Sequence, residues 1–146
     1  YSFTPKIKRI DFAKYLILYT YGGFYIDLDF EIFRDIFELV DKNNVLLGST
    51  AIFYTIPKHK FWLDVFEHIK NNKDKFVLEA TGPKGLEQTY NKNKYEDVKY
   101  LNKEIFFPVT YSNHNDEKCY KDKNCRKKYI NKGSYGIHHF EGIWLN

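Results

Sequence analysis

The sequence predicts an α/β fold, and two observations support this class. Segments with helical periodicity alternate with short β-prone segments along the chain, which is the order expected when helices pack on a sheet. The length of 146 residues suits one domain, and a hydrophobic content of 43% is enough to build a core. We therefore expect residues 1–146 to form a single α/β domain.

The first part of the chain is expected to hold a helix, a turn and a strand. Thr4 and Pro5 are typical of a helix start. The apolar residues that follow at helical spacing are Ile7, Ile10, Ala13, Ile17 and Tyr21. Gly22 and Gly23 then end the helix, and residues 24–30 alternate in the manner of one continuous strand.

The later elements are shorter. Residues 45–54 are β-prone and predict one or two strands, and Pro57 precedes a helix that reaches about Ile69. A turn at Thr81, Gly82 and Pro83 leads into a helix that ends near Tyr90. We further expect a strand at residues 105–109, a polar exposed excursion at residues 113–128, and a last strand at residues 134–140.

The strand at residues 24–30 has an unusual polar face. Because side chains alternate between faces, Tyr25, Asp27, Asp29 and Glu31 share one face, while Phe24, Ile26, Leu28 and Phe30 share the other. A row of carboxylates is self-repelling unless something offsets the charge, and Mg²⁺ or Mn²⁺ prefers such oxygen ligands. The alternative is an ordinary amphipathic strand with a solvated polar face.

The C-terminal strand holds two adjacent histidines, His138 and His139, of which only one easily joins a given site because neighbours point to opposite faces. Neutral imidazole is a good ligand for Mn²⁺, although a structural role is the common one for such a pair.

Gly82 permits close approach of the backbone, and the helix behind it offers free N–H groups. Two cysteines, Cys119 and Cys125, are either bridged or two free thiols.

The charge distribution and the lengths of the apolar stretches argue against two other kinds of protein, one that binds nucleic acid and one that crosses a membrane within this sequence. The formal net charge of +4 is spread along the chain, whereas a nucleic-acid-binding protein typically shows a concentrated basic stripe. No apolar stretch is long enough to cross a bilayer. The chain contains no Met, so we expect a partial sequence, which leaves room for an anchoring or targeting segment before Tyr1.

Residues 11–29 together resemble a known family. The segment Asp-Phe-Ala-Lys-Tyr-Leu-Ile-Leu-Tyr-Thr-Tyr-Gly-Gly-Phe-Tyr-Ile-Asp-Leu-Asp is similar to the signature of glycosyltransferase family 32, whose members contain a DXD motif. The Pro57 to Phe61 segment, the turn at Gly82 and the terminal His pair fall in the order usual for this family.

The resemblance implies a GT-A-type core that lacks its N-terminal strand-helix-strand portion. It also implies transfer of a hexose from UDP- or GDP-sugar to a glycan or lipid, with retained configuration and with Mn²⁺ or Mg²⁺. Asp27, Asp29 and His139 would bind the metal, with His138 as the fallback. Asp29 and Lys14 would be catalytic, and the donor would contact Asp11, Lys14, Asp27, Gly82 and Trp144. A Golgi or secretory lumen, or a membrane association, would suit this activity.

Three departures from the family pattern leave alternatives open. Lys14 replaces the usual Arg and loses its bidentate geometry, Ile143 replaces a Ser near the C-terminus, and the upstream segment is not in this chain. A catalytically inactive sugar- or nucleotide-binding module is therefore one alternative. A two-ion phosphoesterase is another, although it usually needs more His and Asp ligands than this sequence offers.

Overall fold

The computed structural model describes residues 5–40, 44–93, 95–110 and 122–141 of the chain. Its centre is a mixed four-stranded sheet in the order β1-β4-β3-β5, in which β3 and β5 are parallel and the other pairs antiparallel. A separate antiparallel pair joins β2 to β6. The strands are β1 (Gly23–Ile26), β2 (Phe30–Ile32), β3 (Val45–Leu47), β4 (Ile52–Thr55), β5 (Val98–Tyr100) and β6 (Gly136–His138). The α/β class predicted from the sequence is confirmed.

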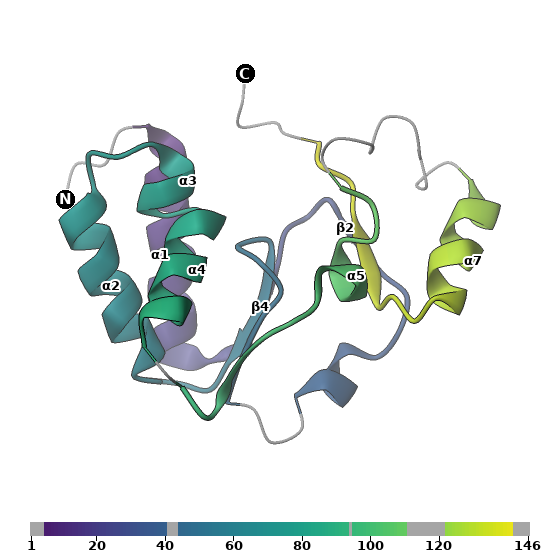
Figure 1. Cartoon of the computed structure of the whole chain (residues 1–146), viewed down its shortest axis with the longest axis horizontal. Helices are drawn as coiled ribbons and strands as arrows, with labels where there is room; N and C mark the ends of the chain where they lie inside the picture. The colour runs from purple at the N-terminus through teal and green to yellow at the C-terminus, as the bar shows by residue number, and fades with distance from the viewer. Residues whose placement is uncertain (1–4, 41–43, 94, 111–121, 142–146) are drawn as a thin grey trace.

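Helices gather on one side of the larger sheet (Figure 1). These are α1 (Lys6–Tyr21), α2 (Phe61–Asn72), α3 (Val77–Ala80) and α4 (Pro83–Lys92). A short 3₁₀ helix, η1 (Ile36–Leu39), follows β2, while α5 (Lys103–Phe106) and α7 (Lys123–Asn131) accompany the smaller sheet. No helix in the described ranges is both long and apolar enough to cross a membrane.

Aromatic side chains fill the core between α1, α2 and the larger sheet. Tyr15 stacks on Trp62 with ring centroids 5.3 Å apart, and Phe53 lies 5.2 Å from Trp62. The polar atoms of these rings are satisfied inside the core, since Trp62 Nε1 donates to Thr55 Oγ1 at 2.8 Å and the Tyr15 hydroxyl donates to the Thr81 carbonyl at 2.7 Å. This packing fixes α1 against the sheet.

The apolar stripe predicted for α1 lies largely on its exposed face. Ile10, Ile17 and Tyr21 are 47%, 55% and 77% exposed. The buried face instead comprises Lys8, Asp11, Lys14, Tyr15 and Leu18. The two buried lysines are accommodated because their ammonium groups donate to main-chain carbonyls of distant segments.

The prediction of one continuous strand at residues 24–30 is wrong. The chain leaves β1 after Ile26, turns through residues 28 and 29, and enters β2 in the second sheet. The Phe30 amide donates to the Asp27 carbonyl at 3.2 Å and closes this turn. Leu28, which belongs to the apolar face of the expected strand, is fully exposed at the turn.

Two other expectations also differ. Residues 105–109 contain the end of α5 and irregular chain instead of a strand, and residues 123–128 of the expected polar excursion belong to α7. An Asn102 side chain that accepts the Glu104 amide begins α5, and an Asp122 side chain that accepts the Asn124 amide begins α7. The remainder of the excursion, with Cys119, lies outside the described residues. Cys125 is disulfide-bonded.

Candidate metal and donor site

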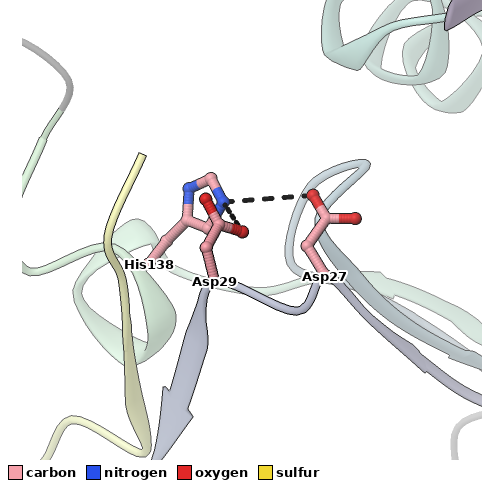
Figure 2. A group of neighbouring side chains, drawn as sticks. All are labelled: Asp27, Asp29 and His138. Carbon is pink, nitrogen blue, oxygen red and sulfur yellow. Dashed lines mark hydrogen bonds and ion pairs between the residues drawn. The ribbon is translucent and has the colours of Figure 1, made fainter. Parts of the chain in front are cut away.

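Asp27 and Asp29 lie where the chain crosses from one sheet to the other. The Asp27 amide donates to the Ala51 carbonyl at 2.8 Å, which ties the end of β1 to the neighbouring β4 hairpin. Asp29 directly precedes β2 and accepts the Glu141 amide at Oδ2, 3.0 Å away. Figure 2 shows the two carboxylates on either side of the turn, with one imidazole facing both. The turn therefore brings the two side chains to one point.

His138 supplies that imidazole. The register of the smaller sheet pairs Phe30 with His138, so the end of β6 lies beside the start of β2. The His138 Nε2 atom is 3.0 Å from Asp29 Oδ1 and 3.9 Å from Asp27 Oδ2 (Figure 2). One ligand atom from each of the three side chains lies within 4.8 Å of the other two. The expected convergence of the Asp pair with a C-terminal histidine is therefore present in the structure.

The structure places His139, the expected ligand, away from this group. Adjacent residues point to opposite sides of a strand, and the His139 Nε2 atom lies 3.4 Å from Glu31 Oε2. Glu31 also pairs with Arg126 at 3.0 Å. Of the three carboxylates expected on one face, Asp27 and Asp29 are therefore the two that lie together with His138. His138, the fallback in the sequence analysis, is the histidine that faces Asp27 and Asp29.

Burial favours the neutral form of the His138 imidazole. The pKa of His138 is lowered chiefly by its burial, which outweighs the opposing effects of Asp29 and Asp27. The ring is packed between aromatic side chains, with the Phe30 centroid at 5.4 Å and the Phe140 centroid at 4.3 Å. Its Nδ1 atom is buried without a hydrogen-bond partner among the described residues. A neutral ring with Nε2 directed at two carboxylates suits a metal ligand.

The three side chains fit a divalent ion. Two ligand atoms at right angles around an ion, each about 2.1 Å from it, lie about 3.0 Å apart. The contact between His138 Nε2 and Asp29 Oδ1 is 3.0 Å, and the Asp27 oxygen lies 3.9 Å from the same nitrogen, about 0.9 Å farther than this arrangement requires. A mixed imidazole and carboxylate set is typical of Mn²⁺ and Zn²⁺ and is tolerated by Mg²⁺.

Tyr25 orients Asp27, a role that the sequence analysis did not assign. Its hydroxyl donates to Asp27 Oδ1 at 2.5 Å, and its ring stacks on Phe53 with centroids 5.2 Å apart. Burial and this hydrogen bond raise the pKa of Tyr25, so the hydroxyl keeps its proton. The signal in the sequence was the spacing of two along a strand, which places Tyr25 and Asp27 on the same face.

Asp11 and Lys14 reach the same cavity from α1. The Lys14 ammonium pairs with Asp11 Oδ1 at 2.9 Å, donates to the Thr50 carbonyl at 2.8 Å, and lies 4.7 Å above the Tyr25 ring. Asp11 also accepts the Thr81 hydroxyl at 2.8 Å. Burial raises the pKa of Asp11 more than Lys14 lowers it. The two opposite charges therefore offset each other in part, and hydrogen bonds to Thr50 and Thr81 hold both side chains in place.

A cavity of about 480 Å³ connects these groups, which is within the usual range for small-molecule sites. Asp27, Asp29 and His138 lie on its wall together with Asp11 and Lys14. Gly82 lies on the wall formed by α3 and α4, where an added Cβ would be 2.7 Å from the Leu78 Cα atom. Trp144 and Ile143 lie outside the described residues.

Comparisons with known proteins agree with the sequence resemblance. Residues 2–50 match the family described as "Glycosyltransferase sugar-binding region containing DXD motif". Inositol phosphoceramide mannosyltransferase 1 of Schizosaccharomyces pombe is 32% identical over 114 residues, which cover 69% of this chain and 34% of that protein. Mannosyl phosphorylinositol ceramide synthase CSH1 of Saccharomyces cerevisiae is 31% identical over 94 residues, covering 56% of this chain and 25% of that protein.

No solved structure matches this chain. The chain spans about a third of the length of the first of these relatives and a quarter of the second. The family resemblance predicted from the sequence is confirmed, and the matched segment contains α1, the turn and both aspartates.

Proposed function

We propose that this chain, whose residues 2–50 hold the sugar-binding region of the DXD-containing glycosyltransferases, is the catalytic part of a metal-dependent glycosyltransferase. It would form a single GT-A-type domain over residues 1–146 and transfer a hexose from a UDP- or GDP-sugar. The observation that supports this best is the convergence of Asp27, Asp29 and His138 on one cavity wall. These ligands come from segments more than a hundred residues apart in the chain, as the Asp29–His138 separation of 109 shows.

Asp27, Asp29 and His138 would hold the ion, which we expect to be Mn²⁺ or Mg²⁺. When bound, such an ion neutralises the charge of a departing nucleoside diphosphate. Tyr25 fixes one oxygen of Asp27 and leaves the other directed toward His138. The protein thus orients its ligands before the donor arrives, which reduces the reorganisation needed on binding.

Asp11 and Lys14 are proposed to hold the hexose of the donor. The Lys14 ammonium and the Asp11 carboxylate lie on the cavity wall and can donate and accept hydrogen bonds to sugar hydroxyls. Asp11 is engaged by both Lys14 and Thr81, which makes it a poor covalent nucleophile. A retaining reaction on one face of the sugar ring fits this arrangement better than a two-step covalent one.

The acceptor is proposed to be a lipid or a glycan. One relative is named an inositol phosphoceramide mannosyltransferase and the other a mannosyl phosphorylinositol ceramide synthase, which favours a lipid with a sugar-like headgroup here. The disulfide at Cys125 is typical of an oxidising compartment, so a secretory lumen is the proposed location.

The test combines nucleotide-sugar hydrolysis with a thermal melt. Mn²⁺ and a nucleoside diphosphate together should raise the Tm more than the sum of the separate shifts, because the ion bridges protein and diphosphate. Asp29→Ala should lose hydrolysis and this synergy while the fold is retained. Asp74→Ala, a change at an exposed carboxylate, is the matched control. Full activity in Asp29→Ala would contradict the proposed site.

An inactive sugar- or nucleotide-binding module is a second candidate, because both Asp29 oxygens already have protein partners. Oδ1 contacts His138 Nε2 and Oδ2 accepts the Glu141 amide, so a metal has to compete for Asp29. Such a module would bind a nucleotide sugar by calorimetry and leave it intact after prolonged incubation with Mn²⁺. Measurable hydrolysis that depends on Asp29 would exclude it.

A further inference from the structure

Exposed apolar side chains lie in, or next to, the lining of the proposed donor cavity. Ile10 and Leu28 both line the cavity, and they are 47% and 105% exposed. Phe76, which is 67% exposed, directly precedes the cavity-lining residues Val77 and Leu78. We call Ile10, Leu28 and Phe76 the apolar rim. Ile10 lies in the first half of α1, Phe76 directly precedes α3, and Leu28 lies in the turn between β1 and β2.

The exposure of Leu28 has no structural purpose in the fold. It lies between the two aspartates at a turn, a position that polar residues usually occupy, and its side chain is entirely open to solvent. Ile10, from α1, adds a second aliphatic side chain to the lining of the same cavity. Single exposed apolar residues are ordinary, but a set beside one ligand cavity indicates a surface that contacts an apolar partner.

Basic side chains accompany the rim. Lys6 lies one helical turn before Ile10, on the same face of α1. Lys75 precedes Phe76, and Lys84 is in the first turn of α4 beside Gly82 of the cavity wall; all three lysines are exposed. Apolar side chains with lysines beside them are the combination that favours the interface of an anionic bilayer.

We propose that the apolar rim docks this chain on an anionic lipid bilayer with the mouth of the cavity at the level of the headgroups. This inference rests on the proposed function, since it lets the headgroup of a lipid acceptor enter the cavity while its tails stay in the bilayer. A second copy of the chain is the less fitting occupant, because it would cover the mouth through which donor and acceptor enter. A stable protein interface also needs about 800 Å² per partner, whereas the rim consists of three side chains around an opening.

The test is co-sedimentation with vesicles made of an equimolar mixture of phosphatidylcholine and phosphatidylinositol, without metal or donor. Ile10→Ser/Leu28→Ser should weaken vesicle binding about tenfold, because two aliphatic side chains no longer leave water. The matched control is Ile17→Ser/Leu63→Ser, which removes one exposed Ile and one exposed Leu, 55% and 52% exposed, that do not line the cavity. It should bind vesicles as the unchanged chain does. Added salt should weaken binding through the lysines.

Several results would overturn the inference. These are an unchanged chain that does not sediment with the vesicles, equal losses in the two double variants, and a dimer in light scattering that only Ile10→Ser/Leu28→Ser converts to monomer. Both double variants replace exposed side chains, so their thermal melts should match that of the unchanged chain. Vesicle binding is measured without catalysis, so its loss leaves the proposed function standing. Conversely, if the chain binds vesicles through the apolar rim but never hydrolyses a nucleotide sugar, the proposed enzymatic function is rejected and the membrane docking stands.

Discussion

Removal of the Lys14 charge should destabilise the protein in a pH-dependent way. Lys14→Met leaves the buried Asp11 carboxylate, whose side chain is 7% exposed, with the Thr81 hydroxyl as its one remaining side-chain partner among the described residues. Breaking a buried ion pair by removing one member costs about 3–5 kcal/mol. Because Asp11 can take up a proton, we expect the lower value, and a Tm lowered by about 6–12 °C for a chain of this size.

The sign of the pH dependence follows from the pKa of Asp11. Burial already raises this pKa above 3.8, and loss of Lys14 raises it further in the folded state only. The folded variant then binds more protons than the unfolded chain, so its stability falls as the pH rises. Urea unfolding should show a larger difference between Lys14→Met and the unchanged chain at about pH 8 than at about pH 5.

The matched control is Lys70→Met, since Lys70 is an exposed lysine of α2; it should stay within about 0.5 kcal/mol of the unchanged chain at either pH. A Lys14→Met variant as stable as this control would refute the buried pair. So would a Lys14→Met variant that becomes less stable toward acidic pH, because that is the opposite sign. The double variant Asp11→Leu/Lys14→Met should recover most of the lost stability, because no uncompensated charge remains.

The other predictions concern single sites. His138→Ala should abolish Mn²⁺ binding in calorimetry whereas His139→Ala should retain it, and the reverse order would contradict the assignment. Gly82→Ala should lower the free energy of unfolding by about 1–3 kcal/mol, because the new Cβ would lie 2.7 Å from the backbone of Leu78; an unchanged urea midpoint would refute this contact. Hydrogen bonds from Asn44 and His59 lower the pKa of Asp97 below 3.8, so this carboxylate stabilises the fold above about pH 4 and less so as pH falls. Asp97→Asn should flatten the dependence of Tm on pH in acid, and an equally steep dependence would exclude this role.

The helices α2 and α4 could be predicted because their signals are local. Apolar spacing in the sequence matches the buried residues of α2, which include Phe61, Trp62, Val65 and Ile69. The Gly82–Pro83 start defines α4 in the same way, since Pro is preorganised for the first helical position. Both elements are determined by residues within a few positions of each other.

The buried face of α1 could not be predicted in this way. Local periodicity favours burial of Ile10 and Ile17, yet the face that packs inward holds Lys8 and Lys14. Their ammonium groups are satisfied by the carbonyls of Lys73, Lys75 and Thr50. These acceptors are 36 to 67 residues away in sequence, so no pattern within the helix contains them.

The choice between His138 and His139 depends on strand register for the same reason. The pairing of Phe30 with His138 decides which imidazole reaches Asp29, and a shift by one residue would exchange the two side chains. The sequence shows two adjacent histidines and cannot show the register of β6 against β2. The Asp pair was identified because its two members are neighbours in the chain.

The turn at residues 27–30 explains why the site lies at the junction of two sheets. In a continuous strand, Asp27 and Asp29 would lie about 6.6 Å apart along a single face, with any third ligand supplied by a neighbouring strand of that sheet. The turn instead transfers Asp29 to the smaller sheet, where β6 supplies His138. Asp27 stays anchored to the larger sheet through Ala51 and Tyr25. A bound ion would therefore join the two sheets, and metal binding and the packing of the smaller sheet should stabilise each other.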